Sequence, residues 1–421
     1  MSTIRQEWNL LDSVLTAAAG ATAIGNESSE FLDTLLDGTV SFYFEIEVKT
    51  SISLTNTVTC RRTGSSTDDA TISVPLLTTA YALIRSAAFT PPAGLDTAYS
   101  VFINAGVGGT TSVKSARVIA VQSGSWTKTA TNIEIGNPQS YTSSTFAALT
   151  NPKYWNYASG NWDGTLTAFF YVTMTSNSTK ITATAELQVA DGTGDGFTGW
   201  AAVGSDLTTT SATPVLLASS SFTLTAGRNY RIVFKTSNSK STINVYNAKI
   251  QIRSTNTPTK GEAQYLLANT ILDAGTGLQL CLTKWDSTEW SGSTVTYEHA
   301  VDAANGSTSV VELDTAAGTQ LTGSVVSSPD NQGISGSVTM PADGNLDLKA
   351  TTNNGDVNGS RILAIFVTTA AAPRSGTTLN TRAEDLGVGI GMGWRMPLDS
   401  VCAPLVLPLP PKQLPQYAET R

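Results

Sequence analysis

The sequence DGTVSFYFEIEV at residues 37–48 contains the pattern that decides the fold. After the Asp-Gly pair, apolar and polar side chains alternate, with Phe42, Phe44, Ile46 and Val48 on one side and Ser41, Tyr43, Glu45 and Glu47 on the other. Successive side chains of a strand point to opposite faces of a sheet, so this alternation predicts a strand with one core face and one solvated face. The Asp-Gly pair indicates a turn that leads into the strand.

The same opening occurs twice more, as DGTLTAFFYVTM at residues 163–174 and WSGSTVTYEHAV at residues 290–301. A second signature follows each opening and reads SAAFTPPAG, SSSFTLTAG and SGSVTMPADG. The closing strands also match, as SARVIAVQS, NAKIQIRS and GSRILAIFVTT. Three ordered copies of the same signatures indicate three repeats, each the size of a medium β-domain.

Short alternating strands separated by Gly, Asn, Asp, Ser and Pro clusters are typical of antiparallel β-sandwiches. We therefore predict an all-β protein with three tandem β-sandwich domains, at residues 1–124, 125–256 and 257–372. The segments Glu7–Ala19 and Glu262–Leu272 could be either short helices or extended chain. Residues 373–421 are rich in Gly and then in Pro, which predicts an extended C-terminal arm that packs either on another subunit or on its own chain.

Composition excludes several classes of function. The chain has 421 residues, with 25 Lys and Arg against 33 Asp and Glu, a net charge of −8. An acidic chain without a basic tract cannot neutralise a run of phosphates, so no nucleic acid and no anionic membrane is expected as a partner. No apolar run is long enough to span a bilayer, and the first residues, MSTIRQEWNL, predict no signal peptide. Cys60, Cys281 and Cys402 are far apart and are expected to be free, buried thiols.

Few residues suggest catalysis or metal binding. The single histidine, His299, lies in a predicted strand without a recognisable triad partner. Asp191 and Asp195, in DGTGDG, are expected to be solvated turn residues, with a bound Ca²⁺ as the alternative because alternate carboxylates suit a hard cation. The glycines of residues 387–393 lack the strand and helix that a phosphate-binding loop requires. The sequence therefore predicts a protein that is not an enzyme and has no cofactor.

Two aromatic clusters could contact a sugar, because flat rings stack on C–H groups while nearby polar groups bind hydroxyls. The candidates are Tyr154, Trp155, Tyr157, Trp162, Trp285 and Trp290. Trp162 and Trp290 occupy the same place in the opening signature, which favours a packing role instead. Both interpretations remain open at this point.

The repeated Asp-Gly-Thr openings at Asp37 and Asp163, with the closing strands around Arg117, Lys249 and Arg361, resemble virion proteins of tailed bacteriophages. These proteins string together jelly-roll-like β-sandwiches, and the resemblance covers most of residues 1–372. It implies a structural component of a phage particle, such as a capsid decoration, fibre or tail-associated protein. It also implies other virion proteins as partners. The lack of a predicted signal peptide indicates synthesis in the host cytoplasm, and the apolar C-terminal arm favours a homo-oligomer.

Such a component is expected to dock through its termini and to display its sandwiches outward. The apolar residues expected to dock are Trp8, Leu11 and Leu15 near the N-terminus and Pro404, Leu405, Leu407, Pro408 and Leu409 in the arm. The alternative is a carbohydrate-binding adhesin or host-recognition module whose aromatic clusters bind a host surface glycan. A polysaccharide-cleaving enzyme using Asp191 and Asp195 is a third possibility.

Overall fold

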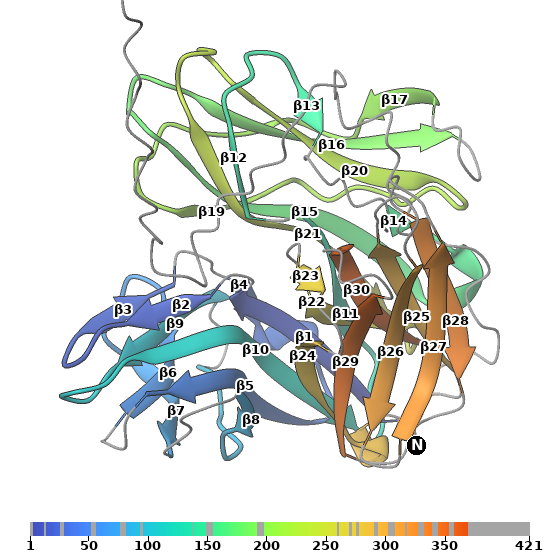
Figure 1. The fold of residues 1–421 in the computed structure, drawn as a ribbon. Helices are drawn as coiled ribbons and strands as arrows, with labels where there is room; N and C mark the ends of the chain where they lie inside the picture. Colours follow the sequence, from blue (N-terminus) through green and yellow to red (C-terminus); the bar gives the residue numbers. More distant parts are fainter. Residues whose placement is uncertain are drawn as a thin grey trace, which may run out of the picture. The chain divides into compact units, whose positions relative to one another are not determined.

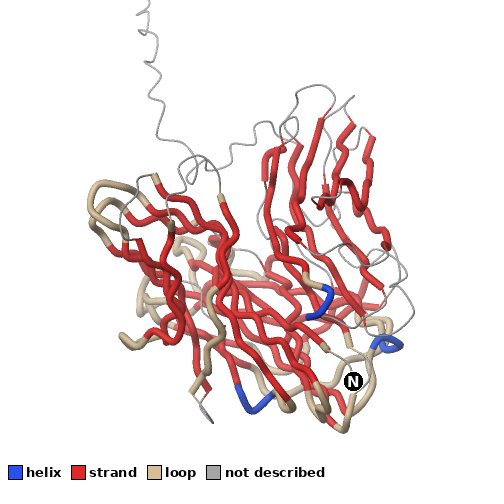
Figure 2. The backbone as a smooth tube through the Cα atoms, turned by 90° about the horizontal axis from the view of Figure 1, so that it is seen from below, coloured by secondary structure: helices blue, strands red, loops and turns tan. Residues whose placement is uncertain are grey.

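The computed structural model describes residues 3–11, 14–25, 29–51, 56–75, 81–92, 96–136, 138–148, 155–191, 198–258, 261–268, 272–274, 278–289, 294–301, 308–315, 318–326, 332–338, 344–352 and 358–368. In the third repeat it describes mainly the backbone, together with the side chains of Asp286, Thr288 and Glu289. The regular structure of these residues consists of strands and three short 3-10 turns (Figure 2). They belong to one compact unit.

The first repeat forms two antiparallel sheets (Figure 1). One sheet has the order β1-β10-β5-β8, with β2 also paired to β10, and the other has the order β3-β9-β6-β7, with β4 also paired to β9. The strands are β1 (Ile4–Leu11), β2 (Leu15–Ala17), β3 (Thr22–Ile24), β4 (Ser29–Leu32), β5 (Thr39–Thr50), β6 (Asn56–Arg62), β7 (Asp68–Val74), β8 (Ala82–Arg85), β9 (Asp96–Asn104) and β10 (Thr111–Ser123), and η1 (Asp33–Leu35) precedes β5.

The second repeat has the same two sheets, in the orders β11-β21-β15-β19 and β13-β20-β16-β17. Three short strands extend them, because β12 pairs with β21, β14 with β20 and β18 with β16. The elements are β11 (Thr129–Gly136), β12 (Gln139–Tyr141), β13 (Ala147–Ala148), β14 (Trp155–Asn156), η2 (Ser159–Asn161), β15 (Thr165–Ser176), β16 (Ala183–Asp191), β17 (Thr198–Ala202), β18 (Leu207–Thr209), β19 (Val215–Ala218), β20 (Asn229–Thr236) and β21 (Ile243–Thr255).

The third repeat has sheets in the orders β22-β30-β25-β28 and β24-β29-β26-β27, and β23 pairs with β30. Its elements are β22 (Glu262–Ala268), β23 (Leu272–Ala274), β24 (Leu278–Trp285), η3 (Ser287–Glu289), β25 (Thr294–Val301), β26 (Thr308–Thr315), β27 (Gly318–Val326), β28 (Gln332–Val338), β29 (Gly344–Thr352) and β30 (Asn358–Thr368).

The three repeats share one topology, that of the jelly roll. If the eight strand positions of a repeat are numbered along the chain, one sheet has the order 1-8-3-6 and the other 2-7-4-5 in all three. This double Greek key places strands from both ends of a repeat side by side. Within the described residues each sheet takes its strands from one repeat only, and residues 124–128 and 256–261 separate the repeats.

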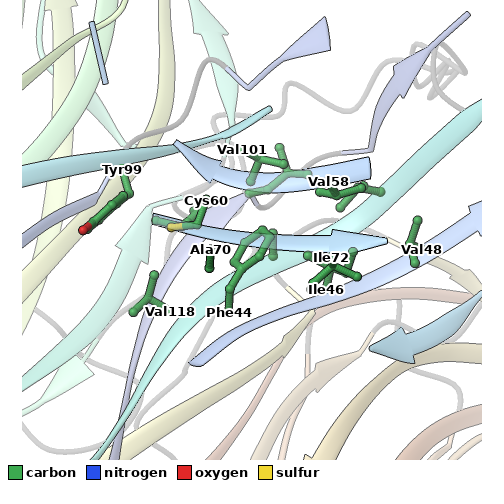
Figure 3. Packing of buried hydrophobic residues seen from close by; sticks show 14 of the residues in the cluster. Phe44, Ile46, Val48, Val58, Cys60, Ala70, Ile72, Tyr99, Val101 and Val118 are labelled. Carbon is green, nitrogen blue, oxygen red and sulfur yellow. The ribbon is translucent and has the colours of Figure 1, made fainter. Parts of the chain in front are cut away.

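The core of the first jelly roll lies between its two sheets (Figure 3). Phe44, Ile46 and Val48 of β5 face Val58 and Cys60 of β6, as the alternation in residues 37–48 predicts. The Cys60 thiol is free and buried, as predicted, and burial raises its pKa well above the ordinary value. The predicted solvated face of β5 is wrong in part, because Glu45 and Glu47 are also buried.

The described part of the segment Glu7–Ala19 contributes to strands β1 and β2 and contains no helix. The described part of Glu262–Leu272 is likewise strand, in β22 and the start of β23. In both repeats, backbone pairing with the closing strand decides the outcome. Apolar spacing that fits a helix also fits a strand that is buried on both faces.

The closing strands align differently from the sequence match. Each pairing with the opening strand contains one irregularity, at Lys114 in β10, Tyr246 in β21 and Arg361 in β30. Arg361 therefore corresponds to Lys114, whereas Arg117 corresponds to Lys249, three positions further along. The sequence match of Arg361 with Arg117 and Lys249 is wrong by these three positions.

Candidate functional site

The first strands of the three repeats, β1, β11 and β22, contact one another. Every residue of β1 and β11 is buried, so each strand is covered on its own sandwich side and on its outer side. The Thr131 hydroxyl donates to the Gln6 side-chain oxygen (2.9 Å), and the side-chain amide of Asn132 donates to the Glu7 backbone carbonyl (3.3 Å). Gln6 and Thr131 hold the same position in their strands. Each lies three residues before the irregularity in the pairing of its strand with the closing strand of its repeat, β10 or β21. Equivalent positions of neighbouring repeats therefore meet.

An ionic cluster occupies the outer face of the first repeat's sheet. Register places Glu45 of β5 between Arg117 of β10 and Arg85 of β8. The Arg85 Nη2 atom lies 3.0 Å from Glu45 Oε2, and the Arg117 Nε atom lies 3.6 Å from Glu45 Oε1. Arg117 also pairs with Glu7 of β1 (3.2 Å), and Arg5 of β1 pairs with Glu7. The side chains of this cross-strand row are between 0% and 12% exposed.

The third repeat contributes the sixth member of this cluster, Glu289 of η3. Arg5 Nη1 donates to Glu289 Oε2 (3.0 Å), and Arg85 also pairs with Glu289. Asp286 holds the turn that carries Glu289, because its carboxylate accepts from the Thr288 amide (3.0 Å) and hydroxyl (2.6 Å). We call the six residues Arg5, Glu7, Glu45, Arg85, Arg117 and Glu289 the junction cluster.

The junction cluster contains three cations and three anions, so its formal charges cancel. Burial acts to lower the pKa of Arg117, but Glu7 and Glu45 outweigh it, so the pKa lies above the ordinary value for arginine. Removing one member of a buried ion pair leaves the charge of its partner uncompensated in an interior that solvates charge poorly. Glu289 of the third repeat therefore lies between two cations of the first repeat, Arg5 and Arg85, and its removal would leave both with one less buried anion.

The turn that opens β5 holds the linker between the first and second repeats. The Asp37 carboxylate accepts hydrogen bonds from the Thr127 amide (2.9 Å) and the Lys128 amide (3.1 Å), both in or next to the linker after β10. Burial acts to raise the pKa of Asp37, but the hydrogen bond from the Thr127 hydroxyl and the two from the backbone amides outweigh it and leave the pKa below the ordinary value. The Asp-Gly-Thr turn at Asp37 thus binds the linker that leads into the second repeat.

In the second repeat, a chain of hydrogen bonds begins at the Arg253 guanidinium. Arg253 donates to Tyr171 (2.9 Å) and to Gln251 (2.9 Å), and Gln251 donates to Asn132 (3.2 Å). Asn132 in turn donates to the Glu7 carbonyl of the first repeat. The two chains of polar contacts meet at β1, which joins the three repeats.

The predicted glycan contacts of the first aromatic cluster are corrected by the structure. Trp155, Tyr157 and Trp162 are 0%, 6% and 5% exposed and belong to the core of the second jelly roll. Their ring faces pack on neighbours such as Tyr230, which is 5.8 Å from Trp155 between ring centroids. They cannot stack on a sugar, and the packing interpretation holds for these three residues.

The other predicted site residues lie at or beyond the limits of the described structure. Tyr154, Trp290 and Asp195 lie outside the described residues. Trp285 ends β24 and Asp191 ends β16, and only their backbone is described. Among the described residues no group of three or more His, Cys, Asp or Glu side chains could hold a metal ion.

The predicted N-terminal docking residues are also corrected. Trp8 and Leu11 are 1% and 2% exposed in the core of the first jelly roll, and Leu15 is half-buried against that core. Trp8 and Leu11 therefore stabilise their own repeat and are not free to dock on another subunit, whereas the docking role of Leu15 stays a prediction. The arm residues Pro404, Leu405, Leu407, Pro408 and Leu409 lie outside the described residues.

Sequence reasoning missed the junction cluster. Its members are scattered from Arg5 to Glu289, and only the fold brings them together. One local signal was present, since Arg5, Glu7 and Glu45 are charged residues inside strand-like segments of a chain with only 14% charged residues. Charges on strands are ordinarily solvated, so that signal alone did not indicate burial.

No family model matches the sequence, and no curated protein matches it. Among solved structures, the CBM22-1–CBM22-2 tandem of Paenibacillus barcinonensis Xyn10C is 11% identical, covering 57% of this chain and 93% of that one with a TM-score of 0.20. A chain from the triple jelly roll structure of an archaeal virus is 10% identical over 87% of this chain and 89% of that one (TM-score 0.18). A chain from infectious bursal disease virus, Gx strain, is 10% identical over 87% and 78% (TM-score 0.22). Values this low carry no argument about function.

The structure contains no helix, within the ranges it describes, with the length and apolar character needed to cross a membrane.

Proposed function

We propose that the protein is a non-enzymatic structural component of a virus particle, such as a capsid decoration, fibre or tail-associated protein of a tailed phage. In this role the three jelly rolls form one projecting body. The C-terminal arm, with Pro404, Leu405, Leu407, Pro408 and Leu409, attaches that body to other copies or to other virion proteins.

The observation that carries this proposal is the junction of the three jelly rolls. A set of independent binding modules needs no more than flexible linkers between its domains. Here β1 and β11 are buried on both faces, and a buried ionic cluster joins the first repeat to the last. A chain that uses buried charges to fix its domains against one another is suited to a mechanical role in an assembly.

The carbohydrate-binding alternative loses its first set of candidate contacts. Trp155, Tyr157 and Trp162 belong to the core, so their aromatic surface stabilises the second jelly roll. An adhesin of this chain would need another surface.

Light scattering on the purified full-length protein tests the proposed role. We expect a mass of three or more 44.1 kDa chains for the wild type. The full-length variant Leu405→Ser/Leu407→Ser/Leu409→Ser is expected to be a monomer, because an interface formed by the arm loses its apolar contacts. The control Ile24→Ser/Val107→Ser, which changes the exposed apolar residues of the first jelly roll, should keep the wild-type mass. A wild type that stays monomeric at tens of micromolar, or an arm variant with the wild-type mass, would contradict the proposed role of the arm.

A further inference from the structure

Two adjoining turns at one end of the second jelly roll, each connecting a strand of one sheet to a strand of the other, have nearly the same polar sequence. The turn after β15 reads TSNSTK at residues 175–180, and the turn after β20 reads TSNSK at residues 236–240. Each contains an Asn in the middle and a Lys at the end.

Hydrogen bonds join the two turns to each other. The Ser237 amide donates to the Thr182 carbonyl (2.9 Å), and the Thr182 amide donates to the Ser237 hydroxyl (2.9 Å). The Lys240 amide is held by the Asn238 side chain of its own turn (2.9 Å). The backbone that carries both lysines is therefore fixed before any ligand arrives, which reduces the entropy lost on binding.

Two further turns, at residues 142–146 and 210–214, belong to the same end. The Thr236 amide donates to the Ser143 carbonyl (2.8 Å), and the Ser176 amide donates to the Ser211 carbonyl (2.7 Å). We call the four turns at 142–146, 177–182, 210–214 and 237–242 the lysine end. Their sequences, TSSTF, NSTKIT, TSATP and SNSKST, contain two lysines and no acidic residue, in a chain whose net charge is −8.

The polar groups of the lysine end are available to solvent. The exposed residues of its two related turns include Asn177, Thr179, Lys180, Asn238, Ser239 and Lys240. Among the described residues neither lysine forms an ion pair, whereas Lys114 and Lys235 pair with Glu47 and Asp206.

The jelly-roll fold does not require this chemistry at this place. In the first repeat the turn between β9 and β10 reads AGVGGT at residues 105–110, and its Val107 is 78% exposed. The same topological position is thus uncharged and partly apolar there. The lysines and asparagines of the second repeat are a property of this surface and not of the fold.

We propose that the lysine end binds an anionic glycan. The two ammonium groups would pair with carboxylate, sulfate or phosphate groups of the sugar chain, while Asn177, Asn238 and the exposed hydroxyls exchange hydrogen bonds with its hydroxyl groups. A protein partner is disfavoured, because interface centres are enriched in aromatic residues and depleted in Lys and Ser. Two lysines also neutralise too few phosphates for nucleic acid. The inference does not depend on the proposed virion role.

Biolayer interferometry on immobilised polysaccharides tests this site. The probes are polygalacturonate (carboxylate), dextran sulfate (sulfate) and wall teichoic acid (phosphate), with unmodified dextran as the neutral control. We expect the full-length protein to bind at least one charged probe but not dextran, and to bind more weakly as salt is raised. Which probe binds identifies the anionic group.

The variant Lys180→Gln/Lys240→Gln should weaken that binding at least tenfold. The control Lys49→Gln/Lys128→Gln makes the same change in net charge away from the lysine end and should bind as the wild type does. Both variants should keep the wild-type mass by light scattering and the wild-type urea midpoint, which separates this test from that of the arm. Absence of binding to all three charged probes would overturn the inference, as would equal binding by the lysine-end variant or an equal loss in the control.

Discussion

Gly38 and Gly164 hold the same position in successive repeats, directly before the opening strand. Both have a left-handed backbone, with φ of +78° and +76°. A Cβ atom at Gly38 would lie 2.9 Å from the Ser125 carbonyl oxygen, and one at Gly164 would lie 2.3 Å from that of Thr255. The Asp-Gly-Thr signature needs glycine because the turn presses against a carbonyl group of the linker at Gly38 and against that of the last residue of β21 at Gly164.

Replacement of Gly164 by Ala should therefore destabilise the protein more than its backbone angle alone explains. Gly204 is the matched control, because it has a similar φ (+73°) and no atom within 4 Å of the added Cβ. Gly204→Ala should cost roughly 1–2 kcal/mol from the left-handed conformation. Gly164→Ala should cost roughly 1–3 kcal/mol more, from the clash. Urea unfolding measures the loss of stability in both variants. Equal losses would show that the close approach of Gly164 to the Thr255 carbonyl is unimportant.

Single residues also show where sequence reasoning succeeds and where it fails. The period-2 pattern placed Phe44, Ile46 and Val48 correctly in the core, because apolar alternation reports burial on one side directly. It placed Glu45 in solvent, yet the side chain is fully buried. The partners that allow this burial, Arg85 and Arg117, are distant in sequence, and no local sequence pattern predicts that they pair with Glu45.

At the scale of elements, β1 contributes side chains both to the core of the first repeat and to the contact with the third repeat. Its Trp8 packs in the first core, while Arg5 pairs with Glu289 of η3 in the third repeat. The covalent linkers join the first repeat to the second and the second to the third. The contact between the first and third repeats has no linker and depends on side chains such as these.

Glu289→Gln should reveal the strength of that contact. The substitution keeps the side chain's shape but leaves Arg5 and Arg85 with one less buried anion, so we expect a loss of about 3 kcal/mol in the free energy of unfolding. Asp206→Asn is the control, since its ion pair with Lys235 is 3.9 Å long and about one-third exposed, and it should cost less than about 1 kcal/mol. Equal and small losses in urea unfolding would mean that the junction cluster contributes little.

The elements themselves were partly predictable. The opening and closing strands were found because each repeat copies them with the same alternation. The segment Glu7–Ala19 stayed ambiguous because residues buried on both faces of β1 do not alternate. The position of Arg361 was assigned incorrectly because a one-residue irregularity in each closing strand leaves no trace in the pattern of apolar residues.

At the scale of the whole molecule, three copies of one topology are joined through equivalent strands. The repeats in the sequence predicted the number of sandwiches, because each copy carries its own opening and closing strands. They did not predict that β1, β11 and β22 would meet, since that contact depends on side chains between repeats and not on the pattern within one. The candidate site at this junction is therefore a product of the assembled fold.

The central claim is that the three jelly rolls act as one body, and native-state hydrogen exchange of the full-length protein tests it most directly. We predict that the amides of β1, β11 and β22 exchange with similar, high opening free energies in the wild type, because β1 and β11 are buried along their whole length and β22 contacts both. Glu289→Gln should lower the protection of β1 and β22 together, while Asp206→Asn should leave both unchanged. Fast exchange of β22 in the wild type, independent of β1 and unaffected by Glu289→Gln, would show that the repeats are separate modules and would contradict the account.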